Sequence, residues 1–272
     1  NRSLWHMTRR KVQMMNFLLF MKWFAWAEQI HILRIFGLTF HRLGDLSDPI
    51  IWDQVIDALH RLLGSDFAIW KHKFTKQELE GLSERGDLKS LLRQVYFVEV
   101  QENNKEQVFI KEIVLYQYYP FIQWLFPDAK YVYLVRDPRD VALSWRKSST
   151  HPGGLIAGAN NWVQDQRQSI PLFVSLAKSG RAILVRYEDL IGQKEVEVQR
   201  ICEFMDVHYD DRMFDYHNDD LTRQNASLNP LWKNLSNSVM VNNSHKFETE
   251  MTKVEVAMVE RICCDEMHFF GY

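Results

Sequence analysis

The pattern of hydrophobic positions alternates short apolar runs with longer stretches of helical spacing. The clearest short run is Tyr131–Val135, in which every side chain is apolar or aromatic. Such a run is typical of a buried strand in a parallel sheet. Asp137 and Pro138 follow it, and these residue types favour the N-cap and the first position of a helix. The pattern therefore predicts a strand that leads directly into a helix, with Arg136 at the junction and helical spacing from Val141 onward.

Similar strands and helices are predicted along the rest of the chain. Strands are expected at residues 95–100, 108–111 and 182–187, and helices at 51–63, 76–92, 115–125, 156–177, 194–205 and 253–270. Gly64 is expected to end the first of these helices in a left-handed conformation. Because strands alternate with helices, the expected fold class is α/β, a parallel sheet flanked by helices.

Two stretches carry weaker patterns. Residues 4–64 are predicted to be largely helical, and the polar, asparagine-rich residues 216–246 to form a long loop. Charged side chains interrupt the apolar residues of Met14–Phe40, so no membrane-spanning helix is predicted there. No repeat or low-complexity linker divides the chain, which favours a single domain over residues 1–272. The chain begins at Asn1 without a methionine or a signal peptide, so a fragment or a processed product is expected.

Composition narrows the classes of function. The 272 residues are 46% hydrophobic and 25% charged, which is ordinary for a globular protein, and the formal net charge is −2. The chain has no global excess of positive charge, so its composition does not indicate a nucleic-acid partner. Any anion site must therefore be a local cluster of Arg and Lys. Three cysteines, Cys202, Cys263 and Cys264, are too few for a disulfide framework and have no zinc-ligand spacing around them. We expect structural thiols and no metal site.

Arg136 is the strongest candidate for binding chemistry. It follows a predicted strand and precedes a predicted helix, and in open α/β sheets ligands bind at the carboxyl ends of strands, where helix N-termini favour anions. A guanidinium group matches phosphate with two parallel hydrogen bonds. The alternative is that Arg136 forms a structural salt bridge with Asp137 or Asp140 and that Ser144 is an ordinary helix residue. Arg139 is expected to be structural or solvated.

Four stretches carry a family resemblance. They are VFIKE (108–112), FPDAKYVYLVRDPRDVALSW (126–145), RAILVRYEDL with EVEVQRICEFMDV (181–190 and 195–207), and HKFETEMTKVEVAMVERICCDEMHFFGY (245–272). In order and spacing they resemble the sulfotransferases that use 3′-phosphoadenosine 5′-phosphosulfate (PAPS). The resemblance covers about residues 108–272 and implies the sulfotransferase fold, which is related to the P-loop-containing nucleotide hydrolases.

The resemblance also implies a nucleotide site. It places Arg136 and Ser144 on the 3′-phosphate of the cofactor, Tyr187 near the nucleotide, and Lys246 in a loop over it. A solvated surface lysine is the alternative for Lys246.

For catalysis, the resemblance brings Lys111 toward the sulfate that is transferred. Glu112 is a candidate general base toward the acceptor hydroxyl. The histidine that many cytosolic members carry two residues after this lysine is replaced by Ile113, and His151 is a weaker candidate base.

One expected feature of the family is missing from the sequence. Members carry a glycine-containing loop near the N-terminus, between a strand and a helix, that holds the 5′-phosphosulfate with backbone N–H groups. The nearest string, Thr8–Gln13, is basic but contains no glycine. We expect the domain to lack its N-terminal strand and loop, which would lie upstream of Asn1; a degenerate loop at Thr8–Gln13 is the alternative. No Gly-Lys-Ser/Thr motif supports a nucleotide kinase.

Four Asn-x-Ser sequons bear on the compartment: Asn1, Asn225, Asn234 and Asn242. Three lie in the predicted polar loop, where glycans could be tolerated, although chance occurrence in an asparagine-rich segment is the alternative. Used sequons would place the protein in the secretory pathway, where the resemblance favours the Golgi lumen; a bacterial cytoplasmic enzyme is the rival.

Two functions remain open at this point. The first is transfer of a sulfuryl group from PAPS to a hydroxyl or amine, with a glycan as the favoured acceptor. The second is a catalytically inactive sulfotransferase-like domain with a binding or structural role. A membrane anchor outside this chain and the oligomeric state stay open.

Overall fold

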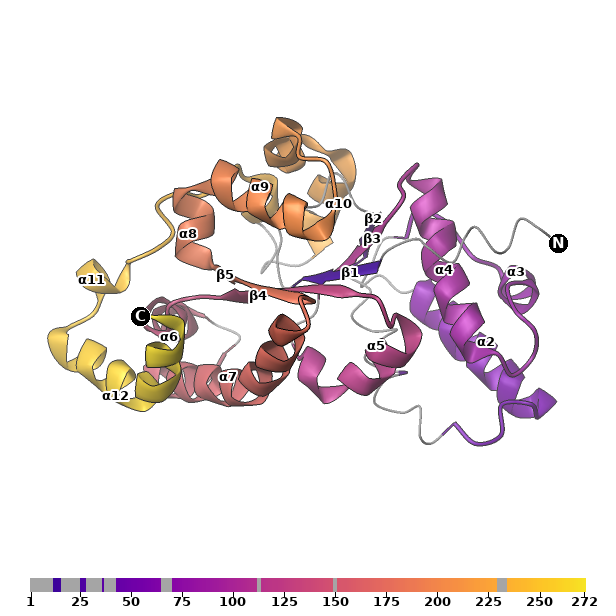
Figure 1. Ribbon diagram of the computed structural model, residues 1–272, viewed down its shortest axis with the longest axis horizontal. Coiled ribbons are helices and arrows are strands. Elements are labelled where there is room, and N and C mark those ends of the chain that lie inside the picture. The colour runs from indigo at the N-terminus through magenta and orange to yellow at the C-terminus, as the bar shows by residue number, and fades with distance from the viewer. Residues whose placement is uncertain are drawn as a thin grey trace. The chain divides into compact units, whose positions relative to one another are not determined.

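The computed structural model describes residues 12–15, 25–27, 36, 43–64, 70–111, 114–148, 151–228 and 234–272 (Figure 1). The chain divides into two compact units. Residues 1–130 and 210–238 form the first unit, and residues 131–209 and 239–272 form the second. Two compact units can belong to one domain, so the single domain expected from the sequence stays a prediction.

Three parallel strands lie in the first unit: β1 (Val12–Met15), β2 (Ala25–Ala27) and β3 (Val108–Ile110). β3 pairs with both of the others, with Phe109 opposite Gln13 of β1 and opposite Trp26 of β2. The helical prediction for residues 4–64 is therefore wrong at β1 and β2. Among the described strands of this unit, β1 and β2 pair only with β3, far along the chain, and a local pattern of closely spaced apolar residues does not indicate such a distant pairing.

The helices before β3 agree only in part with those predicted from the sequence. Asp48 caps α2 (Pro49–Leu63), as its side chain accepts a 2.7 Å hydrogen bond from the Ile50 N–H. Gly64 ends α2 with φ −88°, so the left-handed cap predicted there is wrong. The single helix predicted over residues 76–92 is two helices, α3 (Lys76–Gly81) and α4 (Leu88–Glu102).

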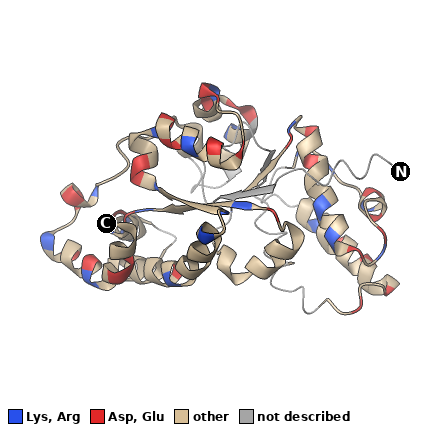
Figure 2. Cartoon of the chain, viewed as in Figure 1, with Lys and Arg blue, Asp and Glu red and all other residues tan. Residues whose placement is uncertain are grey.

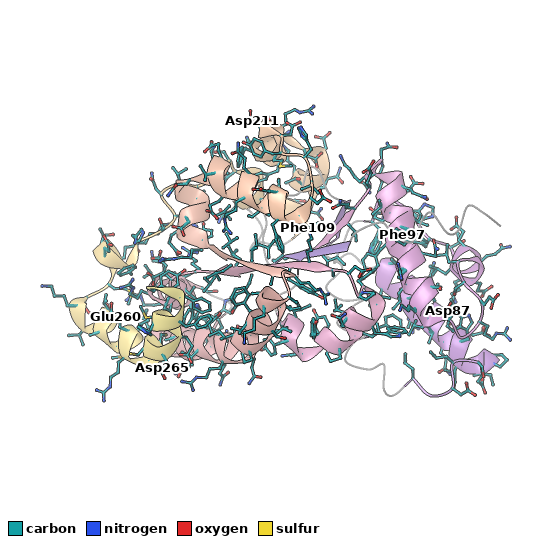
Figure 3. All side chains as sticks on the ribbon, viewed as in Figure 1. Asp87, Phe97, Phe109, Asp211, Glu260 and Asp265 are labelled. Atoms are coloured by element: carbon teal, nitrogen blue, oxygen red, sulfur yellow. The ribbon has the colours of Figure 1, made fainter. Side chains whose placement is uncertain are left out.

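The strand predicted at residues 95–100 is wrong because those residues belong to α4. Asp87 caps this helix at Ser90, and apolar residues then recur at helical spacing; Leu88, Leu91, Leu92, Val95 and Tyr96 are all buried. The β-prone string continues that helical period, and helical packing outweighs its local preference. Figure 3 shows Phe97 of α4 and Phe109 of β3, two of the aromatic side chains buried in this unit.

The long loop predicted for residues 216–246 is wrong in its first part. The 3-10 helix η4 (Asp211–Asn218) and the helix α10 (Asp220–Leu228) occupy its first part. Asp219 caps α10 by accepting a hydrogen bond from the Thr222 N–H at 3.0 Å. Met213, Tyr216 and Ala226 are buried, so these turns bury apolar surface despite their polar composition. After β3, the first unit also contains η3 (Leu115–Gln117) and α5 (Tyr119–Leu125), where a helix was predicted.

The second unit confirms the prediction most fully. β4 (Lys130–Val135) and β5 (Ala182–Arg186) are parallel neighbours, with Val135 opposite Arg186. The chain runs from β4 into α6 (Pro138–Lys147) and α7 (Gly154–Lys178), and from β5 into α8 (Tyr187–Gly192) and α9 (Lys194–Met205). The short α11 (Phe247–Glu250) precedes α12 (Lys253–Phe270), which Gly271 ends in the left-handed region at φ 74°.

Helices cover both faces of the β4–β5 pair (Figure 1). α7 and α12 lie against one face and α8 and α9 against the other. The buried cluster on the α7 and α12 side includes Val135, Ala142, Trp162, Val259 and Phe270. α7 crosses α6 closely because residue 158 is glycine: a Cβ there would lie 2.7 Å from the Trp145 Cβ and 3.0 Å from the Ala142 Cα. Parallel strands joined through helices confirm the α/β class.

Charges are interspersed rather than segregated. Figure 2 shows basic and acidic residues mixed along the helices, in keeping with the small net charge. Among the helices that the structure describes, none combines the length and the apolar character that a membrane span requires.

Candidate functional site

The junction of β4 and α6 holds Arg136 in a fixed backbone conformation. Asp137 caps α6 by accepting a 2.8 Å hydrogen bond from the Arg139 N–H, and Pro138 occupies the first helical position, as predicted. On the other side, the indole N–H of Trp162 donates to the carbonyl oxygen of Arg136 at 3.0 Å. The end of the strand is therefore tied to α6 and to α7 together.

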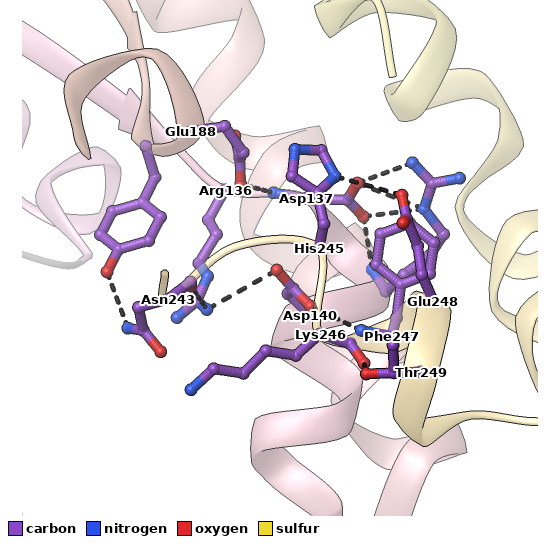
Figure 4. A network of polar contacts seen from close by, with 12 residues as sticks. Arg136, Asp137, Asp140, Glu188, Asn243, His245, Lys246, Phe247, Glu248 and Thr249 are labelled. Atoms are coloured by element: carbon purple, nitrogen blue, oxygen red, sulfur yellow. Dashed lines mark hydrogen bonds and ion pairs between the residues drawn. The ribbon is translucent and has the colours of Figure 1, made fainter. Parts of the chain in front are cut away.

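Contacts with Tyr187 and Asn243 hold the Arg136 side chain from one side (Figure 4). Its guanidinium carbon lies 4.5 Å from the centre of the Tyr187 ring, and its Nη2 donates to the backbone carbonyl of Asn243 at 2.7 Å. Asp140 Oδ2 is 3.8 Å from the same nitrogen. Within the described part of the chain, Nη1 makes no hydrogen bond and the buried Nε has no partner. With 26% of the side chain exposed, Arg136 keeps hydrogen-bond donors for an external anion.

The salt-bridge alternative for Arg136 holds only in part. Asp137 is paired with Arg139 instead, through contacts of 3.0 Å to Nε and 2.7 Å to Nη2. Asp140 faces Arg136 but at a separation longer than a hydrogen bond, and its other oxygen accepts the Phe247 N–H at 3.1 Å. Asp140 is thus partly used by the backbone of a distant segment, and its ion pair with Arg136 includes no hydrogen bond.

Arg139 is structural, as the sequence indicated. Besides Asp137 it binds Glu260 of α12 at 2.8 Å, and its guanidinium lies 4.1 Å from the centre of the Phe247 ring. The hydrogen bonds that Arg139 donates to Asp137 raise the pKa of Arg139 above its usual range. These contacts join α6 to α11 and α12.

The end of β5 supplies the next part of the site. Tyr187, which opens α8, accepts a 2.8 Å hydrogen bond on its hydroxyl from the Asn243 side-chain amide. The neighbouring Glu188 accepts the Asp137 N–H at 3.0 Å and the Tyr272 hydroxyl at 2.8 Å. Burial and the nearby Glu188 carboxylate raise the pKa of Tyr272, so its hydroxyl stays a donor. Glu188 therefore ties β4 to β5 and to the end of α12, while Tyr187 lies beneath Arg136.

Lys246 lies in a segment that packs on Arg136. The segment Asn243–Phe247 is anchored at both ends, by Asn243 on Arg136 and by the Phe247 N–H on Asp140. Lys246 is half-buried and makes no hydrogen bond through its ammonium within the described residues. In Figure 4 its side chain extends to the side of the network on which the Arg136 guanidinium lies. This placement fits the predicted phosphate contact, which stays a prediction.

Ser144 lies on an exposed position of α6, two turns beyond the junction. Its hydroxyl has no hydrogen-bond partner among the described residues, and no contact joins it to Arg136. The shared 3′-phosphate that the resemblance implies for these two residues therefore stays a prediction.

Of the predicted catalytic residues, Lys111 lies in the first unit and His151 in the second. Lys111 follows β3 directly and is half-buried, whereas Glu112 lies outside the described residues. Of the string Thr8–Gln13, Val12 and Gln13 belong to β1, and the other four residues lie outside the described residues. His151, the weaker base candidate, contacts the Ser148 hydroxyl at 2.7 Å and the Trp145 ring at a centroid separation of 4.4 Å.

Of the four sequons, the structure describes three. Asn225 is buried in α10, so the tolerance for a glycan predicted there is wrong, while Asn234 and Asn242 are exposed; Asn1 lies outside the described residues.

Burial raises the pKa of Cys202 to about 11 and that of Cys263 to about 12, which leaves both as unreactive packing thiols. No group of three or more His, Cys, Asp or Glu in the described ranges could hold a metal ion.

Sequence reasoning missed Asn243. It lies in the stretch that was predicted to be loop, and neither periodicity nor residue type distinguishes it from the neighbouring asparagines. The only local signal is the basic–aromatic pair Lys246–Phe247 three residues later.

Comparisons with known proteins identify the family of the chain. Residues 52–211, more than half of the chain, match the family model described as "Sulfotransferase family". Two curated relatives are the Caenorhabditis briggsae "Putative protein-tyrosine sulfotransferase", 33% identical over 36% of this chain and 36% of the relative, and the Caenorhabditis elegans "Protein-tyrosine sulfotransferase A", 28% identical over 40% and 29%. The matched stretches thus span about a third of the curated relatives.

Two solved structures share the fold. The sulfotransferase domain from the curacin biosynthetic pathway superposes with a TM-score of 0.57 at 17% identity, covering 93% of this chain and 95% of that domain. The sulfotransferase domain of the Synechococcus olefin synthase gives 0.52 at 15% identity, over 96% and 94%. Together with the family match, the β4–α6 and β5–α8 junctions lead to one conclusion: the chain belongs to the sulfotransferase family and has the sulfotransferase fold.

Proposed function

We propose that this chain binds PAPS through Arg136 and transfers the sulfuryl group to an acceptor hydroxyl. The observation that carries the proposal is the arrangement at the β4–α6 junction, where Arg136 leaves a strand end and lies on Tyr187 with Nη1 unused by the described residues. A guanidinium in this position can donate to a phosphate with two hydrogen bonds. The family membership makes the 3′-phosphate of PAPS the anion that fits.

The reaction needs charge stabilisation and positioning more than covalent help from the protein. The bond between sulfur and the 5′-phosphate oxygen breaks, a bond from sulfur to the acceptor oxygen forms, and the acceptor proton passes to a base; adenosine 3′,5′-bisphosphate leaves. Fixed cationic donors stabilise charge that develops on such a group. In the proposal Arg136 and Ser144 anchor the nucleotide, Lys111 stabilises the transferring sulfate, and Glu112 is the candidate base.

The proposed acceptor changes from the one favoured by the sequence. Both curated relatives bear the name protein-tyrosine sulfotransferase, and neither name mentions a glycan. A tyrosine hydroxyl in a protein is therefore the first acceptor to test, and a carbohydrate hydroxyl the second.

A transfer assay decides between enzyme and inactive domain. The protein is incubated with PAPS labelled in the sulfate, together with a tyrosine-containing peptide, its tyrosine-to-phenylalanine counterpart, or an oligosaccharide. We expect label on the tyrosine peptide and none on the phenylalanine peptide. Label on the oligosaccharide alone would move the acceptor to carbohydrate. Nucleotide binding without transfer to any acceptor would favour the inactive domain.

The Golgi lumen is the proposed compartment. Its support is the exposure of Asn234 and Asn242, two sequons that an oligosaccharyltransferase could reach. A shift in gel mobility after glycosidase treatment, lost in the double variant Asn234→Gln/Asn242→Gln, would support it. An unshifted protein from secretory-pathway expression would contradict it.

Replacing Ser144 with alanine is expected to weaken binding of adenosine 3′,5′-bisphosphate about tenfold. A hydrogen bond to a charged group contributes about 1.5–3 kcal/mol, and we expect the lower end because Ser144 is exposed. Calorimetric titration measures the change. The matched control is Ser175→Ala, an exposed serine of α7, which should bind like the wild type. Equal affinity of the Ser144 and Ser175 variants would remove Ser144 from the site.

A further inference from the structure

We propose that Asn243 is a positioning residue for the nucleotide site, acting through Arg136 and Tyr187. The inference rests on the proposed function. Asn243 forms hydrogen bonds at the ends of both strands: its backbone carbonyl accepts from Arg136 Nη2 at 2.7 Å, and its side-chain amide donates to the Tyr187 hydroxyl at 2.8 Å. Figure 4 shows Asn243 beside Arg136, with a dashed line for the hydrogen bond of its side-chain amide. Arg136 and Tyr187 also lie on each other, so the three residues close a ring of contacts.

The backbone around Asn243 is fixed independently of this ring. Four residues later the Phe247 N–H donates to the buried Asp140, and the Phe247 ring lies under Arg139. Asp140 and Arg139 belong to the first turn of α6, directly after Arg136. The segment Asn243–Phe247 is therefore held against the same helix end at a second point, so the Asn243 carbonyl is presented to Arg136 from a defined position.

The contacts of Tyr187, Asn243 and Asp140 determine which guanidinium nitrogen of Arg136 remains for a ligand. Tyr187 covers one face, and the Asn243 carbonyl and Asp140 lie on the Nη2 side. The Nη1 protons remain unused among the described residues, so an anion meets a donor whose direction is already set. An unrestrained arginine has many rotamers and must lose that freedom on binding. Ordering the side chain before the ligand arrives lowers that cost, which is the physical meaning of preorganisation.

Removing the side-chain link should loosen Arg136 without deleting it. Asn243→Ala removes the amide but keeps the backbone carbonyl. Tyr187→Phe removes the same hydrogen bond from its other end but keeps the ring beneath the guanidinium. We expect each variant to bind adenosine 3′,5′-bisphosphate about 3- to 10-fold more weakly, as one neutral hydrogen bond allows. The double variant should be within about twofold of either single variant, because both remove one interaction.

The experiment is calorimetric titration of these variants with adenosine 3′,5′-bisphosphate and with adenosine 5′-phosphate, which lacks the 3′-phosphate. The weakening should appear with the first ligand and not with the second. The matched control is Asn242→Ala, the exposed neighbour in the same turn, in protein prepared without glycosylation. A melting curve confirms that each variant is folded.

The outcomes separate this inference from the proposed function. If the wild type binds both nucleotides equally or binds neither, the proposed function and this inference both fail. If the wild type prefers the bisphosphate and the Asn243 and Tyr187 variants match it, only the positioning role is overturned. If Asn243→Ala does not fold, Tyr187→Phe alone decides, and unchanged binding in that variant overturns the role.

Discussion

Replacing Arg136 with alanine is expected to lower the affinity for adenosine 3′,5′-bisphosphate by about 100-fold or more and to abolish detectable sulfate transfer. Truncating one partner of a hydrogen-bonded charge pair costs about 2–5 kcal/mol, and each 1.4 kcal/mol is a factor of ten. The ion pair of Arg136 with Asp140, at 3.8 Å, is longer than a hydrogen bond and leaves the Nη1 donors of Arg136 for the phosphate. Calorimetry gives the affinity, and the labelled-sulfate assay gives the transfer rate.

Two further variants make the Arg136 result specific. Arg136→Lys keeps the charge but loses the planar fork and its stacking on Tyr187, so we expect an intermediate loss of affinity. Arg212→Ala serves as the matched control because its side chain is 67% exposed and pairs with the nearby Asp210. Arg212→Ala should bind like the wild type. If Arg136→Ala also binds like the wild type, the anion site is not at the β4–α6 junction.

Replacing Asp137 with alanine is expected to destabilise the protein by about 3–5 kcal/mol. This carboxylate is buried, caps α6 and pairs with Arg139 through two guanidinium nitrogens. Its removal leaves the mostly buried Arg139 with Glu260 alone as an ionic partner, and breaking a buried pair from one side has a cost of that order. The urea midpoint of unfolding measures the loss.

The companion variants for Asp137 separate the cap from the charge. Asp137→Asn keeps a side-chain oxygen that can cap the helix, so it should be less destabilising than alanine. Asp265→Ala, at an exposed position of α12, should change stability by no more than about 0.5 kcal/mol. A loss below about 1 kcal/mol for Asp137→Ala would show that the Asp137–Arg139 pair does not hold the junction together.

The second unit was predictable because its signals are local. Tyr131–Val135 is an uninterrupted apolar run, and the Asp137–Pro138 pair marks the start of the next helix in the positions that capping requires. The same holds for α12, which Gly271 ends at positive φ. The candidate anion-binding arginine followed from these two boundaries alone, since a residue between a strand and a helix lies at the ligand-binding edge.

The sequence-based predictions failed where contacts between residues far apart in the sequence determine the structure. β1 and β2 pair with β3, whose residues lie more than eighty positions further along the chain. Val95–Val100 has the composition of a strand, but Leu88, Leu91 and Leu92 begin a buried helical stripe that it continues. Asn243 contacts Arg136 across 107 positions, and no sequence pattern reports such a contact. The local sequence therefore predicts the arginine but not Asn243, which holds its side chain.

The central claim is that the β4–α6 junction binds the 3′-phosphate of the cofactor. Its most direct test is the ratio of two dissociation constants, for adenosine 5′-phosphate and for adenosine 3′,5′-bisphosphate, measured at one salt concentration in the wild type and in Arg136→Ala. We predict that the wild type prefers the bisphosphate by at least about tenfold and that the preference disappears in the variant. A wild type that binds both nucleotides equally, or a preference that survives in Arg136→Ala, would contradict the claim.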